Sequence, residues 1–121
     1  MRHTSTKRRH RQDEAAPVRE ELIARVGRCE FCGDDKSALC VHEVLRGSHR
    51  QKALDQLYAV LCLCWPCHEL MGGRPLAEQL AILRRSRRED YDLQAFHALA
   101  GRNYPDEADV RMWLKRITLA A

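Results

Sequence analysis

Apolar residues follow two different spacings along this chain, and each spacing predicts a different kind of element. Residues 17–26 place apolar side chains at helical intervals, and Gly27 follows as a typical end of a helix. Segments 38–45 (ALCVHEVL) and 58–63 (YAVLCL) are short apolar runs of the kind found in strands. A short helix is expected over residues 68–71. The first half of the chain therefore predicts a helix, two strands and a second helix.

Helical spacing dominates the second half of the chain. An apolar stripe follows Pro75, and Asp92 is placed to cap a further helix that ends at Gly101. A last helix is expected after Pro105, because apolar residues then recur at intervals of three and four. These residues are Val110, Trp113, Leu114 and Ile117. The charged segment 84–91 (RRSRREDY) predicts a solvated turn. The expected fold class is a small α+β protein with about three C-terminal helices.

The composition excludes several classes of protein. The chain has 121 residues, of which 45% are hydrophobic and 31% are charged, as in a soluble globular protein of one domain. No apolar run approaches the roughly 20 residues that a membrane helix needs. The basic N-terminus is not followed by the apolar stretch of a secretory signal, so we expect a cytoplasmic protein that does not bind membranes.

The positive charge is concentrated at the N-terminus. The net charge is +4, but residues 1–12 carry five cations and no acid, whereas the rest carries 16 basic and 17 acidic groups. Residues 1–13 lack apolar periodicity, so we expect a disordered basic arm before a single domain over 14–121. Such an arm fits contact with DNA phosphates, and a solvated tail is the alternative. The cations are Arg2, Lys7, Arg8, Arg9 and Arg11.

The spacing of four cysteines predicts a metal site. Cys29 and Cys32 form one Cys-x-x-Cys pair, and Cys64 and Cys67 form a second. Two such pairs supply four thiolates in a tetrahedron, which suits a structural Zn²⁺ ion. Gly33 follows the first pair and allows the positive φ that this kind of turn often requires. Without a secretion signal, a disulfide scaffold is not expected.

Two further cysteines lie within the apolar strand segments. Cys40 and Cys62 are each flanked by apolar residues, so we expect core thiols. A nucleophilic Cys40 assisted by His42 is the alternative, although no feature of the sequence indicates an activated thiolate.

Three residues between and beside the cysteine pairs suggest a second metal site. His42 and Glu43 stand near the end of the first predicted strand, and His68 directly follows the last zinc cysteine. If the two cysteine turns meet at one zinc, His68 comes close to the two strands. A regular strand turns Glu43 to the face opposite His42, so Glu43 joins the site only if the strand bends or bulges there. Two imidazoles and a carboxylate are adequate ligands for a divalent ion, with positions left open for water and phosphate.

The order of these motifs resembles the zinc-stapled HNH endonucleases, which belong to the ββα-metal, or His-Me finger, nucleases. The similarity covers about residues 29–71 and includes CVHEVLRGSHRQKA followed by LCWPCHEL, as in a phage-type subgroup with a His-Glu pair. It implies a ββα-metal hairpin core over about residues 28–73. The helical extension expected over 74–121 lies outside the resemblance. A phage-encoded protein would act in the cytoplasm of its host.

The resemblance implies a metal-dependent endonuclease that hydrolyses DNA phosphodiester bonds. His42, Glu43 and His68 correspond to the catalytic residues and to the ligands of Mg²⁺, Mn²⁺ or another divalent ion. The role of His42, as base or as ligand, stays open. The central Asn of the family has no counterpart, because residues 28–76 contain no Asn. That absence favours the alternative, an inactive zinc module that binds DNA or a protein.

A basic loop follows the His-Glu pair. Residues 46–52 (RGSHRQK) carry three cations and no acid, so the loop can grip phosphates beside the bond to be cleaved. A solvated loop without a ligand is the alternative. The residues expected to bind DNA are Arg46, His49, Arg50 and Lys52, together with Lys7, Arg8, Arg9 and Arg11 of the arm.

Overall fold

The structure, a computed structural model, describes the backbone of residues 6–46 and 50–120 and the side chains of residues 13–46 and 52–119. It is a small α+β protein with a two-stranded antiparallel sheet and a cluster of four cysteines. The elements in chain order are α1 (Thr6–Val26), β1 (Leu39–Glu43), α2 (Arg50–Ala53), the 3₁₀ helix η2 (Leu57–Ala59), β2 (Val60–Cys64), α3 (Trp65–Met71), α4 (Leu76–Ser86), α5 (Leu93–Ala100) and α6 (Glu107–Ala120).

The two strands form the centre of the molecule. They pair in a register that sets Val41 opposite Cys62 and His42 opposite Leu61. All five residues of β2 are buried, because helices or loops cover both of its faces. Helix α3 begins directly after β2 with Pro66 in its first turn, a position where the missing N–H of proline costs no helical hydrogen bond. The second cysteine pair is thus fixed by the end of a strand and the start of a helix.

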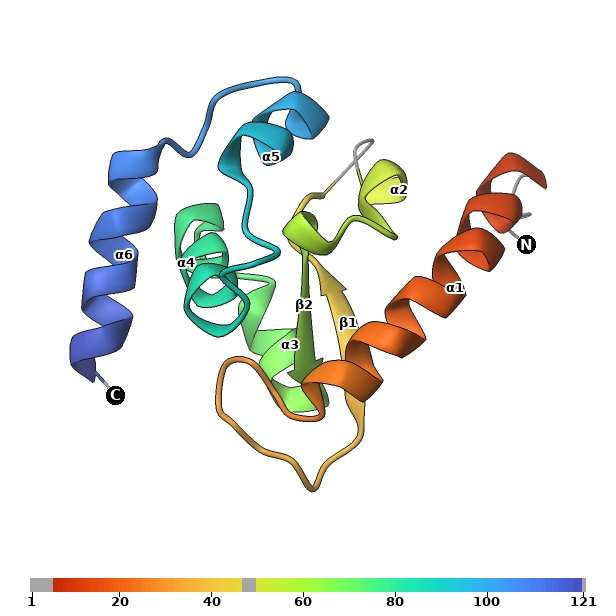
Figure 1. Ribbon diagram of the computed structural model, residues 1–121, viewed down its shortest axis with the longest axis horizontal. Coiled ribbons are helices and arrows are strands. Elements are labelled where there is room, and N and C mark those ends of the chain that lie inside the picture. The colour runs from red at the N-terminus through yellow and green to blue at the C-terminus, as the bar shows by residue number, and fades with distance from the viewer. Residues whose placement is uncertain (1–5, 47–49, 121) are drawn as a thin grey trace.

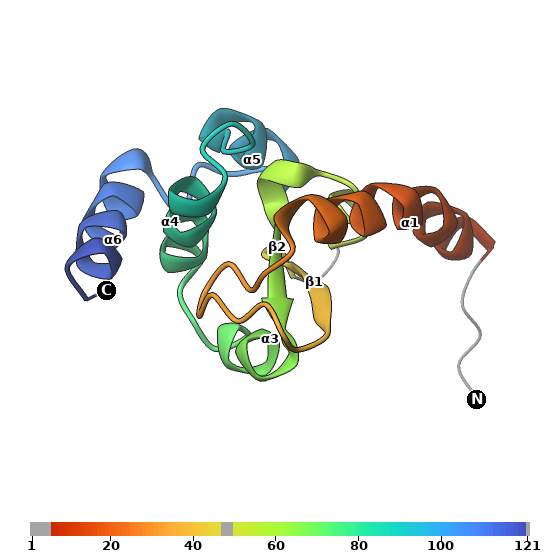
Figure 2. The same ribbon diagram turned by 60° about the horizontal axis from the view of Figure 1, so that its bottom comes forward.

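Helices surround the sheet on two sides. Helix α1 and helix α6 lie at opposite ends of the molecule, with the sheet and α3 between them (Figures 1 and 2). Helix α6 packs on α4, and its residues Trp113, Leu114 and Ile117 contact the main core. Fully buried Phe96 and Leu83 belong to the same core. Within the described residues, no helix combines the length and the apolar character that a membrane crossing needs.

The predicted strands and C-terminal helices agree with the structure to within a few residues. Asp92 caps α5, since its side chain accepts a hydrogen bond of 3.0 Å from the backbone N–H of Ala95. Gly101 ends the same helix with a φ of 74°, in the left-handed region that glycine adopts without strain. The local capping chemistry was therefore sufficient to locate this helix.

The prediction of a disordered segment over residues 1–13 is wrong for residues 6–13, which belong to α1. The helix was expected to begin at Pro17, but Pro17 lies inside it. Residues 6–16 lack an apolar stripe yet are rich in Lys, Arg, Gln, Glu and Ala, which have high helix propensity. A proline within a helix removes one hydrogen bond without always ending the helix, so it was mistaken for a first residue.

The prediction of a solvated turn over residues 84–91 is also wrong. Arg87 is only 3% exposed and donates hydrogen bonds to the carbonyls of Leu57 and Val60, in the segment that leads into β2. Asp90, which accepts from Arg87 at 2.8 Å, is mostly buried too. Buried charged side chains of this segment therefore connect the loop between α4 and α5 to the sheet.

Candidate functional site

The four cysteines of the two Cys-x-x-Cys pairs converge between the loop after α1 and the start of α3. The ligand atoms of Cys29, Cys32, Cys64 and Cys67 all lie within 4.8 Å of one another, so these residues are positioned to hold a metal ion. The Sγ atoms of Cys32 and Cys64 are 3.8 Å apart. Tetrahedral bonds of about 2.3 Å to zinc would separate two sulfurs by roughly 3.8 Å, so the spacing fits zinc.

Backbone groups shape the first cysteine turn. Gly33 has a φ of 82°, and its N–H donates to the carbonyl of Cys29 at 2.9 Å. Burial raises the pKa of the Cys29 thiol, but the backbone N–H groups of Cys32, Cys64 and Phe31 outweigh burial and lower it to about 7. The backbone N–H of Asp34 lowers the pKa of Cys32, but burial and the neighbouring thiols outweigh it and raise this pKa, and burial raises the pKa of Cys67. The metal site is therefore indicated by the positions of the sulfurs and not by the pKa of one thiol.

Of the two remaining cysteines, Cys62 is a core thiol, as expected, whereas Cys40 is not fully buried. Cys62 is fully buried, and burial raises its pKa to about 12. Cys40 is half-buried, donates a hydrogen bond of 3.3 Å to the carbonyl of Leu63, and has a pKa raised mainly by burial. Neither group has the lowered pKa of a reactive thiol, which argues against the nucleophilic alternative for Cys40.

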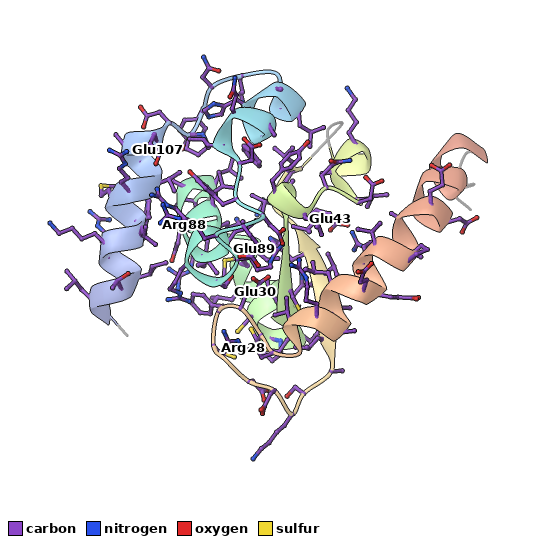
Figure 3. The ribbon with its side chains drawn as sticks, viewed as in Figure 1. Arg28, Glu30, Glu43, Arg88, Glu89 and Glu107 are labelled. Atoms are coloured by element: carbon purple, nitrogen blue, oxygen red, sulfur yellow. The ribbon has the colours of Figure 1, made fainter. Side chains whose placement is uncertain are left out.

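A buried carboxylate ties the first cysteine turn to the sheet and to α4. Glu30 lies between Cys29 and Cys32 in the chain and points away from the sulfurs toward β2 and α4 (Figure 3). Its carboxylate accepts hydrogen bonds from the N–H of Cys62 at 2.7 Å, from the Ser86 hydroxyl and from Nε of Arg87 at 2.9 Å. Because each oxygen is used, this buried ion pair is stabilised by hydrogen bonds as well as charge.

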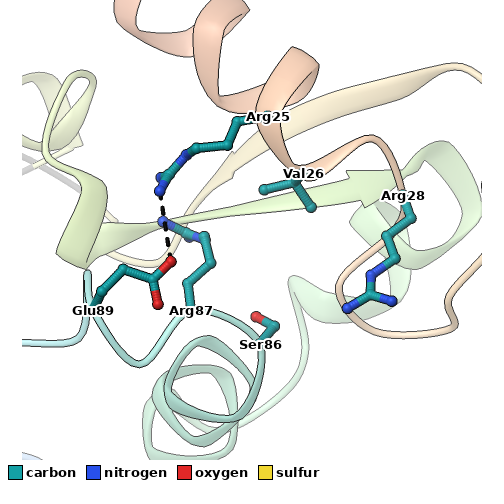
Figure 4. A pocket seen from close by; sticks show the side chains of 6 residues that line it. All are labelled: Arg25, Val26, Arg28, Ser86, Arg87 and Glu89. Atoms are coloured by element: carbon teal, nitrogen blue, oxygen red, sulfur yellow. Dashed lines mark ion pairs between the residues drawn. The ribbon is translucent and has the colours of Figure 1, made fainter.

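The ion-pair network continues to the C-terminal end of α1. Arg25 contacts Glu89 at 3.6 Å and Asp90 at 2.6 Å, and Asp90 also contacts Arg87. Arg25, Arg87 and Glu89 line a cavity of about 270 Å³ with Ser86 on its wall (Figure 4). The network links α1, the α4–α5 loop and, through Arg87, the cysteine turn.

His42 and His68 lie side by side, although they are 26 residues apart in the chain. Their Nδ1 atoms are 3.0 Å apart and their ring centroids 5.0 Å apart. His42 is 6% exposed, whereas His68 is partly open to solvent beside the exposed ring of Trp65. Burial lowers the pKa of His42, so this imidazole favours its neutral form. A ligand would reach the pair from the side of His68.

Gln79 of α4 fixes the orientation of His42. Its amide Nε2 donates to the carbonyls of Met71 at 3.1 Å and Arg74 at 3.0 Å, which leaves Oε1 to face His42 Nε2 at 2.8 Å. An amide oxygen only accepts, so Nε2 of His42 carries the proton. The lone pair of neutral His42 is therefore on Nδ1 and points toward His68. A buried acceptor on the far nitrogen is typical of histidines that bind metal ions.

Glu43 does not join the two histidines, contrary to the prediction. Side chains alternate along a regular strand, so Glu43 points to the face opposite His42. It lies between the sheet and α1, where its Oε1 is 3.1 Å from Nη1 of Arg19 (Figure 3). Arg19 also donates to the carbonyls of Val41 and Leu54 at 3.1 Å. Glu43 therefore helps to attach α1 to the sheet.

The basic residues expected to bind DNA are only partly described. Arg46 follows β1 near the histidine pair, and its charge is among the causes that lower the pKa of His42. Lys52 is exposed on α2. His49 and the side chains of Arg50, Lys7, Arg8, Arg9 and Arg11 lie outside the described residues.

Three residues that orient His42 or anchor the first cysteine turn were not predicted from the sequence. Gln79 interrupts the apolar stripe of α4 with a polar side chain, and that interruption was a usable signal. Arg87 is one of four arginines in a charged run, and Glu30 is one acid within the cysteine turn. Neither has a local pattern that distinguishes a buried ion from a solvated one.

Comparison with known proteins gives no match: no family model, no curated sequence and no solved structure is similar to this chain.

Proposed function

We propose that this protein is a metal-dependent DNA endonuclease of the HNH type, in which His42 and His68 bind the catalytic divalent ion. The contact between their Nδ1 atoms, 3.0 Å long, is the observation that carries the proposal. Two imidazole nitrogens bound at right angles to one ion, with bonds of about 2.1 Å, would be separated by about the same distance. The proposed hairpin core comprises β1, β2 and α3.

The protonation of His42 supports a role as ligand rather than as base. Its Nε2 proton is held by Gln79, and its Nδ1 lone pair faces His68. When His68 carries its own proton on Nε2, both Nδ1 lone pairs are free for one ion. A divalent ion such as Mg²⁺ or Mn²⁺ would neutralise the charge that develops on a phosphate during hydrolysis.

Because His68 is partly exposed, a polymeric substrate could approach the histidine pair from the solvent. Two protein ligands would leave most coordination positions of the ion for water and phosphate oxygens, which Mg²⁺ commonly retains. Arg46 at the end of β1 supplies a cation nearby for the phosphate. Cleavage of DNA, rather than chemistry on a small enclosed ligand, is consistent with this open arrangement.

An inactive zinc module that binds DNA or a protein is the second candidate. Among the described residues, the four cysteines are the only group of three or more metal-ligating side chains, and Glu43 is paired with Arg19. With the missing Asn of the resemblance, this observation favours a protein that retains the zinc cluster without the chemistry.

Cleavage of supercoiled plasmid tests the proposal. The zinc-loaded protein is incubated with Mg²⁺, Mn²⁺ or Ni²⁺, with no added ion, and with EDTA. Elemental analysis of each sample verifies that the cysteine cluster keeps its zinc. We expect nicked plasmid only where a second divalent ion is present. If the plasmid stays intact with every ion while zinc remains bound, the second candidate replaces the first.

A further inference from the structure

A cavity of about 370 Å³ is bordered by three arginines. Arg46 follows β1, Arg74 lies between α3 and α4, and Arg102 follows α5. Three segments that are distant in the chain thus bring arginines to one cavity. Arg74 and Arg102 belong to the helical extension, and no motif in the sequence marked them.

The charges around this cavity do not cancel. Glu78 is 3.6 Å from Arg74, a loose contact that leaves most of the guanidinium donors of Arg74 unused. Among the described side chains, Arg46 and Arg102 have no ion-pair partner, and both are exposed. Three cations against one carboxylate make the hollow attractive to an anion, and guanidinium groups match the geometry of phosphate oxygens.

A chain of hydrogen bonds connects the cavity wall to the histidine pair. The carbonyl of Arg74 accepts from the Gln79 amide at 3.0 Å, and the same amide group holds His42. Arg46 stands four residues after His42. A ligand held by these arginines would therefore be next to one that contacts His42 and His68.

The walls of the cavity combine apolar and polar groups. Leu45, Pro75 and Leu76 line it together with the glycines 72 and 73. A Cβ atom on Gly72 would be at ordinary contact distance, 3.6 Å, from Nη2 of Arg46, so the guanidinium of Arg46 lies against this wall. Apolar walls beside cations suit a sugar–phosphate unit better than a free hydrated anion.

We propose that this cavity binds one phosphate group of a nucleic-acid strand, adjacent to the phosphate at the histidine pair. The inference rests on the proposed function and adds Arg74 and Arg102 to its binding surface. The phosphate is either an internal phosphodiester or a terminal phosphate, and both present the same oxygens to the arginines.

The salt dependence of DNA binding tests whether the arginines share a phosphate. Fluorescence anisotropy is measured on zinc-loaded protein with a single-stranded oligonucleotide, without a second divalent ion, over a series of NaCl concentrations. We expect Arg74→Ala combined with Arg102→Ala to weaken binding by about tenfold or more and to lower the salt slope by about one. Arg88→Ala removes an exposed arginine that does not line the cavity, and we expect a change below about threefold.

Two oligonucleotides distinguish the sources of the phosphate. If the cavity takes a terminal phosphate, a 5′-phosphorylated strand binds the unaltered protein more tightly than its 5′-hydroxyl counterpart, and the double variant loses that difference. If it takes an internal phosphodiester, both strands bind equally, and both weaken equally in the double variant. Thermal unfolding and zinc content verify that each variant is folded.

Three outcomes overturn the inference. The double variant could bind like Arg88→Ala, or its salt slope could fall by about two, which would mean two separate surface contacts. Absence of DNA binding by the unaltered protein would reject both this inference and the proposed function. If the double variant binds and cleaves DNA normally, the phosphate site in the cavity is rejected and the proposed function stands. If the arginines contribute to DNA binding but the unaltered protein does not cleave, the endonuclease activity is rejected and the phosphate site stands.

Discussion

The cysteine cluster at the C-terminal end of β2 and the histidine pair nearer its start are built differently. Four sulfurs within 4.8 Å of one another form a closed ligand set, of which Cys32 is the exposed member. The histidine pair offers only two nitrogens, and His68 is open to solvent. Closed sites of four protein ligands stabilise a fold, whereas sites with open positions admit water and substrate. The difference fits a stabilising role for the first region and, under the proposed function, a catalytic role for the second.

Helix α4 supports both regions from its two ends. Gln79 near its start fixes His42, and Ser86 at its end contacts Glu30 in the first cysteine turn. Arg87, directly after the helix, completes the anchor of Glu30. The helical extension is therefore more than added core, because it positions both groups of ligands.

Loss of a zinc ligand is expected to have the largest effect. Cys67→Ser leaves three thiolates and removes much of the binding free energy that couples zinc to folding. We expect the variant to lose stoichiometric zinc and its cooperative thermal transition. Cys40→Ser changes a half-buried thiol outside the cluster and should retain both. Elemental analysis and circular dichroism measure these outcomes, and a folded, zinc-free Cys67→Ser protein would contradict a structural zinc.

Removal of Glu30 is expected to weaken the fold without removing the metal ligands. Glu30→Ala leaves Arg87 buried with one of its two carboxylate partners lost, which should cost about 3–5 kcal/mol in the free energy of unfolding. Arg25→Ala removes a more exposed member of the same network and should cost less than about 1 kcal/mol. Urea unfolding of zinc-loaded proteins compares them. Equal losses would mean that the buried ion pair does not anchor the cysteine turn.

Replacement of Gln79 should affect the histidine pair and leave the cysteine cluster unchanged. Gln79→Met keeps the length of the side chain but cannot accept the proton of His42 Nε2. We expect plasmid nicking to fall by about 10–100-fold and half-maximal nicking to require more Mn²⁺. Zinc content and DNA affinity should not change. An unchanged Mn²⁺ requirement would show that Gln79 has a packing role only.

The positions of the strands, of one C-terminal helix and of the cysteine cluster could be predicted from the sequence, because residues close together in the chain determine them. Apolar runs located β1 and β2, the Asp92 cap and Gly101 located α5, and the cysteine spacing located the metal cluster. The approach of His42 to His68 also followed, because the zinc ligand Cys67 adjoins His68 in the chain. These inferences depend on neighbours in sequence or on one cross-link.

Burial of charge could not be predicted in the same way. Arg87 and Glu30 lie in polar segments, and only the packing of α4 against the first cysteine turn determines that they meet. Glu43 was expected at the metal site, but the regular alternation of β1 turns it toward Arg19. The start of α1 was missed because propensity without an apolar stripe leaves no periodic signal.

Plasmid nicking by His42→Ala, compared with Glu43→Gln, tests the central claim most directly. The two residues are neighbours in the chain and point to opposite faces of the sheet, so they form a matched pair. We predict that His42→Ala, with its zinc content and DNA affinity unchanged, has no ion-dependent nicking, and that Glu43→Gln cleaves within about threefold of the unaltered protein. Cleavage by His42→Ala at the unaltered rate would contradict the assignment of the histidine pair as the catalytic metal site.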